Sequence, residues 1–119
     1  MVLGLGLVQA QIPNEKVLDK TWKVNLMLNT SHEFVVATKQ KIYINNDNMI
    51  VVPQCYRWDY YFKIVSVTDE RLVLEEYEYT PKKLTPTGNH VFFTKSDLTG
   101  ADLEKLDYKQ KPHYLRINS

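Results

Sequence analysis

This sequence contains little of what several common classes of protein need. Its 119 residues include one cysteine, Cys55, so an internal disulfide, a CxxC redox pair and a multi-cysteine metal cluster are excluded. The formal net charge is only +1, whereas binding to a phosphate backbone needs concentrated Lys and Arg. We therefore expect no nucleic-acid partner, and we expect Cys55 to be a small buried hydrophobic residue.

The motifs of common catalytic centres are also missing. The three histidines, His32, His90 and His113, are far apart and form neither HxxxH nor HExxH spacing, which zinc enzymes use. No GxSxG element is present for nucleophilic catalysis. The four glycines form no phosphate-binding loop pattern. We therefore predict that the protein is not an enzyme, with no catalytic residues, no metal site and no cofactor.

One acidic cluster remains as a candidate for chemistry. In an extended strand, Glu76 and Glu78 lie on one face and Glu75 lies on the other. Two carboxylates on one face can perform acid–base chemistry at a sugar. The favoured interpretation is a solvent-exposed face that keeps the sheet soluble.

The first ten residues, Met1 to Ala10, are uncharged and largely apolar. They are too few to span a bilayer, which needs about 20 apolar residues, but they match the hydrophobic region of a secretory signal peptide. Val8 and Ala10 are the small residues that a signal peptidase reads, and cleavage is expected after Ala10. We predict a signal-peptide remnant over residues 1–10, one domain over 11–119, and a periplasmic or secreted protein without a transmembrane segment. A buried N-terminal strand is the alternative for the first ten residues.

The rest of the chain mostly alternates between apolar and polar residues, which is typical of half-buried strands. The predicted strands are 22–28, 34–38, 41–44, 49–52, 56–67, 72–79, 91–95 and 113–117. Turns are expected at 45–48 and 68–71, and a longer loop at 81–89, which contains two prolines and a glycine. Leucines with helical spacing over 96–108 predict a short helix, which Pro112 is expected to end. The predicted fold is all-β: an antiparallel meander of about eight strands that closes into a small barrel, with one short C-terminal helix.

Aromatic residues are the unusual feature of the composition. The chain has eight tyrosines, and aromatic residues alternate along the strand over 56–67. The interior of a β-barrel lined with flat, hydroxylated rings can hold an apolar or sugar-like ligand. Plain core packing of a small barrel is the alternative. The candidate ligand-binding residues are Trp58, Tyr60, Phe62, Tyr77 and Phe93.

Three segments together resemble the lipocalin-like domains of small exported bacterial proteins, which are common in Bacteroidetes. They are Leu18-Asp-Lys-Thr-Trp22, Lys41-Ile-Tyr-Ile-Asn-Asn-Asp-Asn48, and Trp58 to Val67 followed by Thr68-Asp-Glu-Arg-Leu-Val-Leu74. The resemblance implies that Trp22 plugs the closed end of a barrel, and that Arg116 corresponds to the family's arginine that packs across this tryptophan. Lys20 stands where lipocalins have glycine.

These observations lead to two main functional hypotheses, and a third, an enzyme, would require a nucleophile and a base that converge in the fold. The first is an exported, non-enzymatic binding module that holds a small hydrophobic ligand in a shallow barrel lumen. The second is a cell-envelope interaction or inhibitor domain with a filled core, whose outer strands bind another protein. A cavity favours the first, and an apolar outer patch favours the second.

Overall fold

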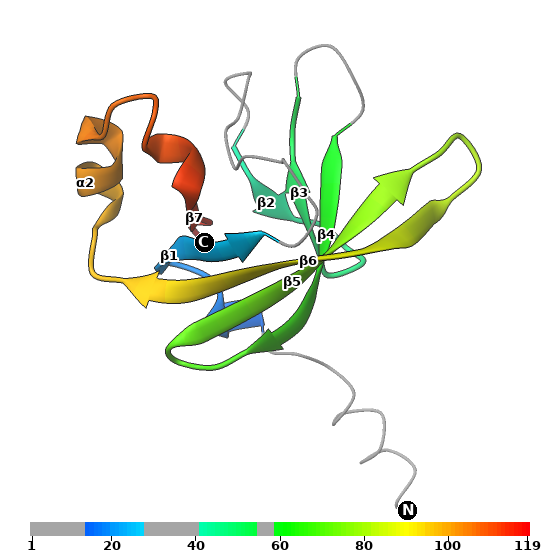
Figure 1. Cartoon of the computed structure of the whole chain (residues 1–119), viewed down its shortest axis with the longest axis horizontal. Helices are drawn as coiled ribbons and strands as arrows, with labels where there is room; N and C mark the ends of the chain where they lie inside the picture. Colours follow the sequence, from blue (N-terminus) through cyan, green and yellow to red (C-terminus); the bar gives the residue numbers. More distant parts are fainter. Residues whose placement is uncertain (1–13, 28–40, 55–58) are drawn as a thin grey trace, which may run out of the picture.

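The computed structural model of the chain describes residues 14–27, 41–54 and 59–119. In chain order, its elements are η1 (Asn14–Lys16), β1 (Thr21–Met27), β2 (Tyr43–Ile44), β3 (Met49–Val52), β4 (Tyr60–Val67), β5 (Arg71–Tyr79), β6 (Leu84–Ser96), α2 (Gly100–Lys105), η2 (Lys111–His113) and β7 (Tyr114–Arg116). The strands form one antiparallel sheet in the order β2-β3-β4-β5-β6-β1-β7. The sheet curves into a half-barrel, with α2 beside one end (Figure 1). The predicted all-β class is confirmed.

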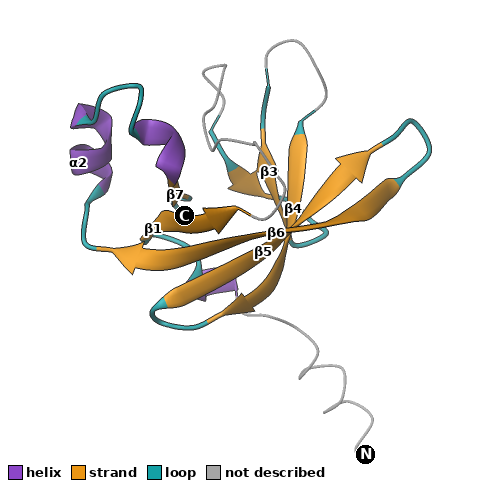
Figure 2. Ribbon diagram, in the orientation of Figure 1, coloured by secondary structure: helices purple, strands orange, loops and turns teal. Residues whose placement is uncertain are grey.

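The described residues form a half-barrel, and the predicted closed barrel of eight strands stays a prediction. Within the described ranges, the sheet has seven strands and ends at β2 on one side and β7 on the other. The predicted strand over 34–38 lies outside the described residues. From β2 to β6 the strands follow the predicted meander, and β1 then inserts between β6 and β7 (Figure 2).

Side chains that bond to the backbone determine the first two turns. The Asn45 Oδ1 atom accepts hydrogen bonds from the backbone N–H groups of Asp47 and Met49, at 2.9 and 3.0 Å. Asn48 adopts a left-handed conformation with φ of 60°, which Asn tolerates better than most residues. In the next hairpin, Thr68 Oγ1 accepts from the N–H of Arg71 at 3.0 Å. The predicted turns at 45–48 and 68–71 are confirmed.

The predicted loop over 81–89 is wrong. The turn between β5 and β6 is shorter, with the Thr80 N–H donating to the Lys83 carbonyl at 3.0 Å, and β6 begins at Leu84. Pro86 and Gly88 therefore lie inside a 13-residue strand. They are tolerated there because the ladder is irregular between the pairs Tyr77↔Pro86 and Glu75↔His90, and such bulges accept proline and glycine.

The core lies on the concave face of the half-barrel. The long strands β4, β5 and β6 contribute alternate residues to it, as a period of two requires. Its buried members are Val17, Trp22, Ile50, Val52, Phe62, Ile64, Leu72, Leu74, Val91, Phe93, Leu115 and Ile117. On β4 the face with Phe62 and Ile64 is thus the inner one. The alternation of the sequence does not determine which of the two faces is buried.

Trp22 closes the β1–β7 end of this core. Its side chain has 0% exposure, and its Nε1 donates to the Val17 carbonyl at 3.2 Å. It pairs across the strands with Leu115. Arg116 Nη1 donates to Thr21 Oγ1 at 3.0 Å, one residue before the tryptophan.

The predicted C-terminal helix is confirmed as α2, although it is shorter than the segment 96–108. Thr99 caps it: its Oγ1 accepts from the Asp102 N–H at 3.1 Å, and Asp102 Oδ2 accepts from the Thr99 N–H at 2.9 Å. This reciprocal pair is a capping box. Pro112 then opens η2 instead of ending the helix, and β7 follows at Tyr114–Arg116.

We expect Thr99→Ala to lower the free energy of unfolding by about 1 kcal/mol, because the Asp102 N–H loses its hydroxyl acceptor, while the backbone N–H of residue 99 keeps its bond to Asp102 Oδ2. Thr99→Ser retains the hydroxyl and should leave stability nearly unchanged, as measured by urea denaturation. The backbone hydrogen bond from Thr99 lowers the pKa of Asp102 below its ordinary value of 3.8. The stabilisation by Asp102 is therefore complete above pH 3.8 and is lost as the pH falls through the lower folded pKa. A Thr99→Ala variant as stable as the Thr99→Ser variant at neutral pH would contradict the capping role.

Candidate functional site

The inner face of the half-barrel changes from apolar to polar along three neighbouring strands. On β5 the inward residues run from Leu74 to Glu76, and on β4 from Phe62 to Tyr60. On β6 they run from Val91 to Asn89. Because these strands are antiparallel neighbours, all three changes occur at the same end of the sheet. The core is therefore apolar towards Trp22 and polar at the opposite mouth.

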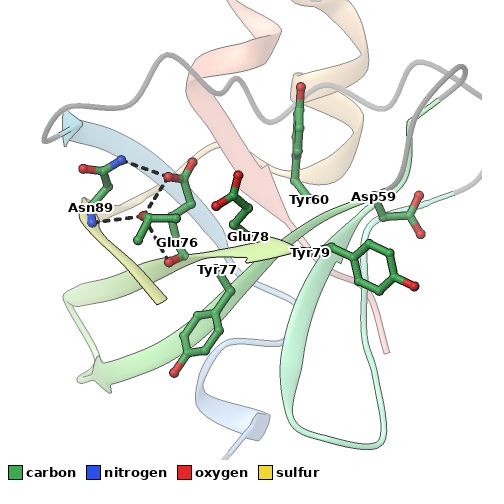
Figure 3. A pocket seen from close by; sticks show the side chains of 8 residues that line it. Asp59, Tyr60, Glu76, Tyr77, Glu78, Tyr79 and Asn89 are labelled. Carbon is green, nitrogen blue, oxygen red and sulfur yellow. Dashed lines mark hydrogen bonds between the residues drawn. The ribbon is translucent and has the colours of Figure 1, made fainter. Parts of the chain in front are cut away.

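A hollow of about 220 Å³ lies at this mouth. The β4–β5 ladder reaches only as far as the pair Tyr61↔Tyr77. Beyond this pair, residues of both strands line the hollow together with side chains of β6 (Figure 3). The lining residues are Asp59, Tyr60, Glu76, Tyr77, Glu78, Tyr79, Thr87 and Asn89.

Glu76 forms the innermost polar group of the hollow. It is 6% exposed, and it pairs across the ladder with the buried Phe62. Its Oε1 accepts hydrogen bonds from Thr87 Oγ1 and from Asn89 Nδ2, both at 2.9 Å (Figure 3). A buried carboxylate is tolerated when its charge is compensated by such donors. The interpretation of the glutamate cluster as a solvent-exposed face is therefore wrong for Glu76.

The irregular part of β6 explains why these donors meet Glu76. Between the pairs at Glu75 and Tyr77, the single residue Glu76 faces three residues of β6, 87–89. Gly88 at the centre has φ of +90°, which favours glycine. This bulge turns the two flanking side chains, Thr87 and Asn89, towards the carboxylate.

All charged residues that line the hollow are acidic: Asp59, Glu76 and Glu78. Asp59 Oδ1 accepts from the Gln54 N–H at 3.2 Å. Figure 3 shows Glu78 on the same side of β5 as Glu76, as their spacing predicts. The hollow therefore offers hydrogen-bond acceptors and a negative potential, which disfavour an anionic ligand.

The outer face of the same strands carries a second group of aromatic residues. Tyr61 and Tyr79 stack with ring centroids 6.1 Å apart, and Tyr43 is 46% exposed. Partial burial raises the pKa of the Tyr61 hydroxyl, and the negative charge of Asp59 raises it further. We call Tyr43, Tyr61, Tyr77 and Tyr79 the outer tyrosine cluster.

The five predicted ligand-binding residues have different surroundings. Phe62 and Phe93 are core residues, 1% and 2% exposed. Tyr60 is half-buried, packs against the core and lines the hollow. Tyr77 belongs to the wall of the hollow, but its ring points to the opposite side of β5 from Glu76 (Figure 3). Trp58 lies outside the described residues.

Sequence reasoning missed Thr87 and Asn89, because both fall in the segment that was expected to be a loop. The available signal was Gly88 between two short polar residues, a pattern that also suits a bulge inside a strand. The sequence correctly predicted that Glu76 and Glu78 lie on the same face of one strand.

Among the described residues, no group of three or more His, Cys, Asp or Glu side chains is arranged to hold a metal ion. In the same ranges, no helix has the length and apolar character needed to cross a membrane. Comparisons of the chain with protein-family models, curated proteins and solved structures found no match.

Proposed function

We propose that this protein is an exported, non-enzymatic binding module that holds a small ligand at the mouth of the half-barrel. The observation that carries the proposal is the hollow of about 220 Å³, which has an aromatic wall at Tyr60 and a hydrogen-bonded carboxylate, Glu76, at its inner end. Binding sites of this kind combine apolar area with a few positioned polar groups. The apolar stretch over residues 1–10 supports export.

The polar lining refines the chemistry of the expected ligand. A purely hydrophobic ligand would desolvate Glu78 and Asp59 without replacing their bonds to water, which is unfavourable. A ligand with an apolar ring and one donor group would pack against Tyr60 and donate to a carboxylate. We therefore propose an uncharged or cationic small molecule of this amphipathic type.

Three matched probes test the proposal: 2-phenylethylamine, 2-phenylethanol and phenylacetate, each titrated into the ¹⁵N-labelled protein and followed by NMR. We expect the amine or the alcohol to bind with a dissociation constant of about 1 mM, the range for so few heavy atoms. Phenylacetate should not bind, because the acidic lining repels it. Shifts should centre on the amides of Tyr60, Glu76 and Asn89.

Variants on the two faces of β5 provide the control. Glu78→Gln on the inner face and Tyr60→Ala should each weaken binding of the better probe at least about fivefold, the cost of a lost hydrogen bond or ring contact. Glu75→Gln, on the outer face of the same strand, should leave it unchanged. The proposal fails if no probe binds and native mass spectra of protein from its natural host also show no bound molecule.

The outer tyrosine cluster favours a second candidate, the interaction domain. Tyrosine is enriched at protein interfaces, and Tyr43 and Tyr79 are 46% and 39% exposed. This candidate requires no ligand in the hollow. Loss of partner binding in Tyr43→Ser, with binding retained in Glu78→Gln, would support it over the binding module.

A further inference from the structure

The hairpin of β5 and β6 consists of two parts that differ in how far β5 pairs with its other neighbour, β4. In its first part, from Arg71↔Thr94 to Glu75↔His90, β5 lies between β4 and β6 in the sheet. Its second part pairs at Tyr77↔Pro86, Glu78↔Thr85 and Tyr79↔Leu84, and among the described residues its pairing with β4 ends at Tyr61↔Tyr77. We call residues 77–86 the hairpin arm. Figure 1 shows the arm projecting beyond the body of the sheet.

The β6 bulge lies between the two parts, where a hinge would be. Three residues, 87–89, face Glu76 alone, so the regular ladder is interrupted at this point. Gly88 adopts φ of +90°, and a Cβ atom there would meet nothing within 4 Å. A side chain would thus find open space at Gly88, and glycine restricts the backbone angles there least.

Contacts at the base of the arm and on its outer face fix its position. At the base, Glu76, just before the arm, accepts from Thr87 Oγ1 and Asn89 Nδ2, just after it, both at 2.9 Å. These bonds close the bulge against β5, and the low polarity of their buried surroundings strengthens them. On the outer face, Tyr79 stacks on Tyr61 of β4.

We propose that the hairpin arm is a movable wall of the hollow, which pivots at the β6 bulge and is latched by the carboxylate of Glu76. The arm supplies Glu78 and Tyr79 to the hollow, while Asp59 and Tyr60 belong to the opposite wall. A change in the angle of the arm therefore widens or narrows the hollow. Thr87 and Asn89 act as positioning residues in this device. The inference goes beyond the proposed function, because it concerns the ligand-free protein.

Hydrogen–deuterium exchange of the ligand-free protein, resolved by residue with NMR, tests the latch. In the double variant Thr87→Val/Asn89→Ala, we expect arm amides to exchange about tenfold faster, since two bonds to a buried carboxylate are lost. Amides of the first part of the hairpin, such as Leu74 and Val91, should keep their rates. Both substituted residues are at least partly exposed, so the variant should fold.

A matched control is available on the same strand. Thr94 also uses its Oγ1 to bond a neighbouring strand, donating to Asn25 Oδ1 at 3.2 Å, but it lies far from the bulge. Thr94→Val should leave exchange of the arm unchanged. Glu76→Gln keeps a carbonyl acceptor without the charge, and should accelerate exchange of the arm less than the double variant does.

Two results would overturn the inference. Unchanged exchange of the arm in the double variant would show that the ladder and the Tyr61–Tyr79 contact hold it without the latch. Equal acceleration in the arm and in the first part of the hairpin would show that Glu76 stabilises the whole sheet and controls no separate motion. Failure of the phenyl probes to bind would leave both measurements valid, so the two proposals fail independently.

Discussion

Replacing Trp22 with alanine is expected to lower the free energy of unfolding by about 3–5 kcal/mol, the range for deleting a large aromatic side chain from a core. The side chain has 0% exposure, and it closes the end of the core where β1 and β7 pair. A small domain has a total stability of about 5–15 kcal/mol, so this loss removes a large part of it. The measurement is urea denaturation followed by circular dichroism.

Trp22→Phe separates packing from hydrogen bonding at the same position. Phenylalanine retains most of the apolar volume but loses the Nε1 donor that bonds the Val17 carbonyl at 3.2 Å. We expect a loss of about 1–2 kcal/mol, since a buried carbonyl then lacks this partner. If Trp22→Ala changed stability by less than the phenylalanine variant, the assignment of Trp22 to the core would be wrong.

Phe93→Ala should lower the free energy of unfolding by about 3–5 kcal/mol, whereas Phe92→Ala should cost less than half as much. The two residues are neighbours on β6 and point to opposite faces. Phe93 is 2% exposed and pairs with the buried Leu72. Phe92 is half-buried on the outer face and pairs with Val73. The difference between them therefore measures which face of the sheet forms the core.

This comparison also tests the earlier assignment of Phe93 to a ligand lumen. A side chain that lines an empty lumen makes few contacts, so its truncation costs little. A packed core residue instead leaves a cavity that the surroundings fill only partly. Equal effects of the two substitutions, in matched urea titrations, would contradict the packing of the inner face.

The sequence predicted the strands well where a clear physical signal marked both ends. Met49–Val52 was predicted as a strand and is β3. Its start follows a turn that the short polar side chains of residues 45–48 specify, and its end precedes Pro53. A helix was also predicted within 96–108, because the apolar spacing is a local feature, and the structure places it at Gly100–Lys105.

The sequence was a poor guide where long-range pairing opposed local propensity. Proline and glycine over 81–89 predicted a loop, yet pairing with β5 extends β6 back to Leu84. The partners of Glu76 depend on this pairing, since Thr87 and Asn89 are 11 and 13 residues away along the chain. No local pattern specifies which residues a bulge will place opposite a given side chain.

The amino-acid sequence by itself determined that this chain forms antiparallel strands, where most of its turns fall, and that Glu76 and Glu78 share a face. These properties follow from the two-residue period of a strand and from short-range hydrogen bonds. Only the tertiary structure decided which face is buried, that the described sheet is a half-barrel, and that a buried carboxylate lies at its polar mouth. Those properties depend on the register between strands and on the curvature of the sheet, which arise from contacts between residues distant in the chain.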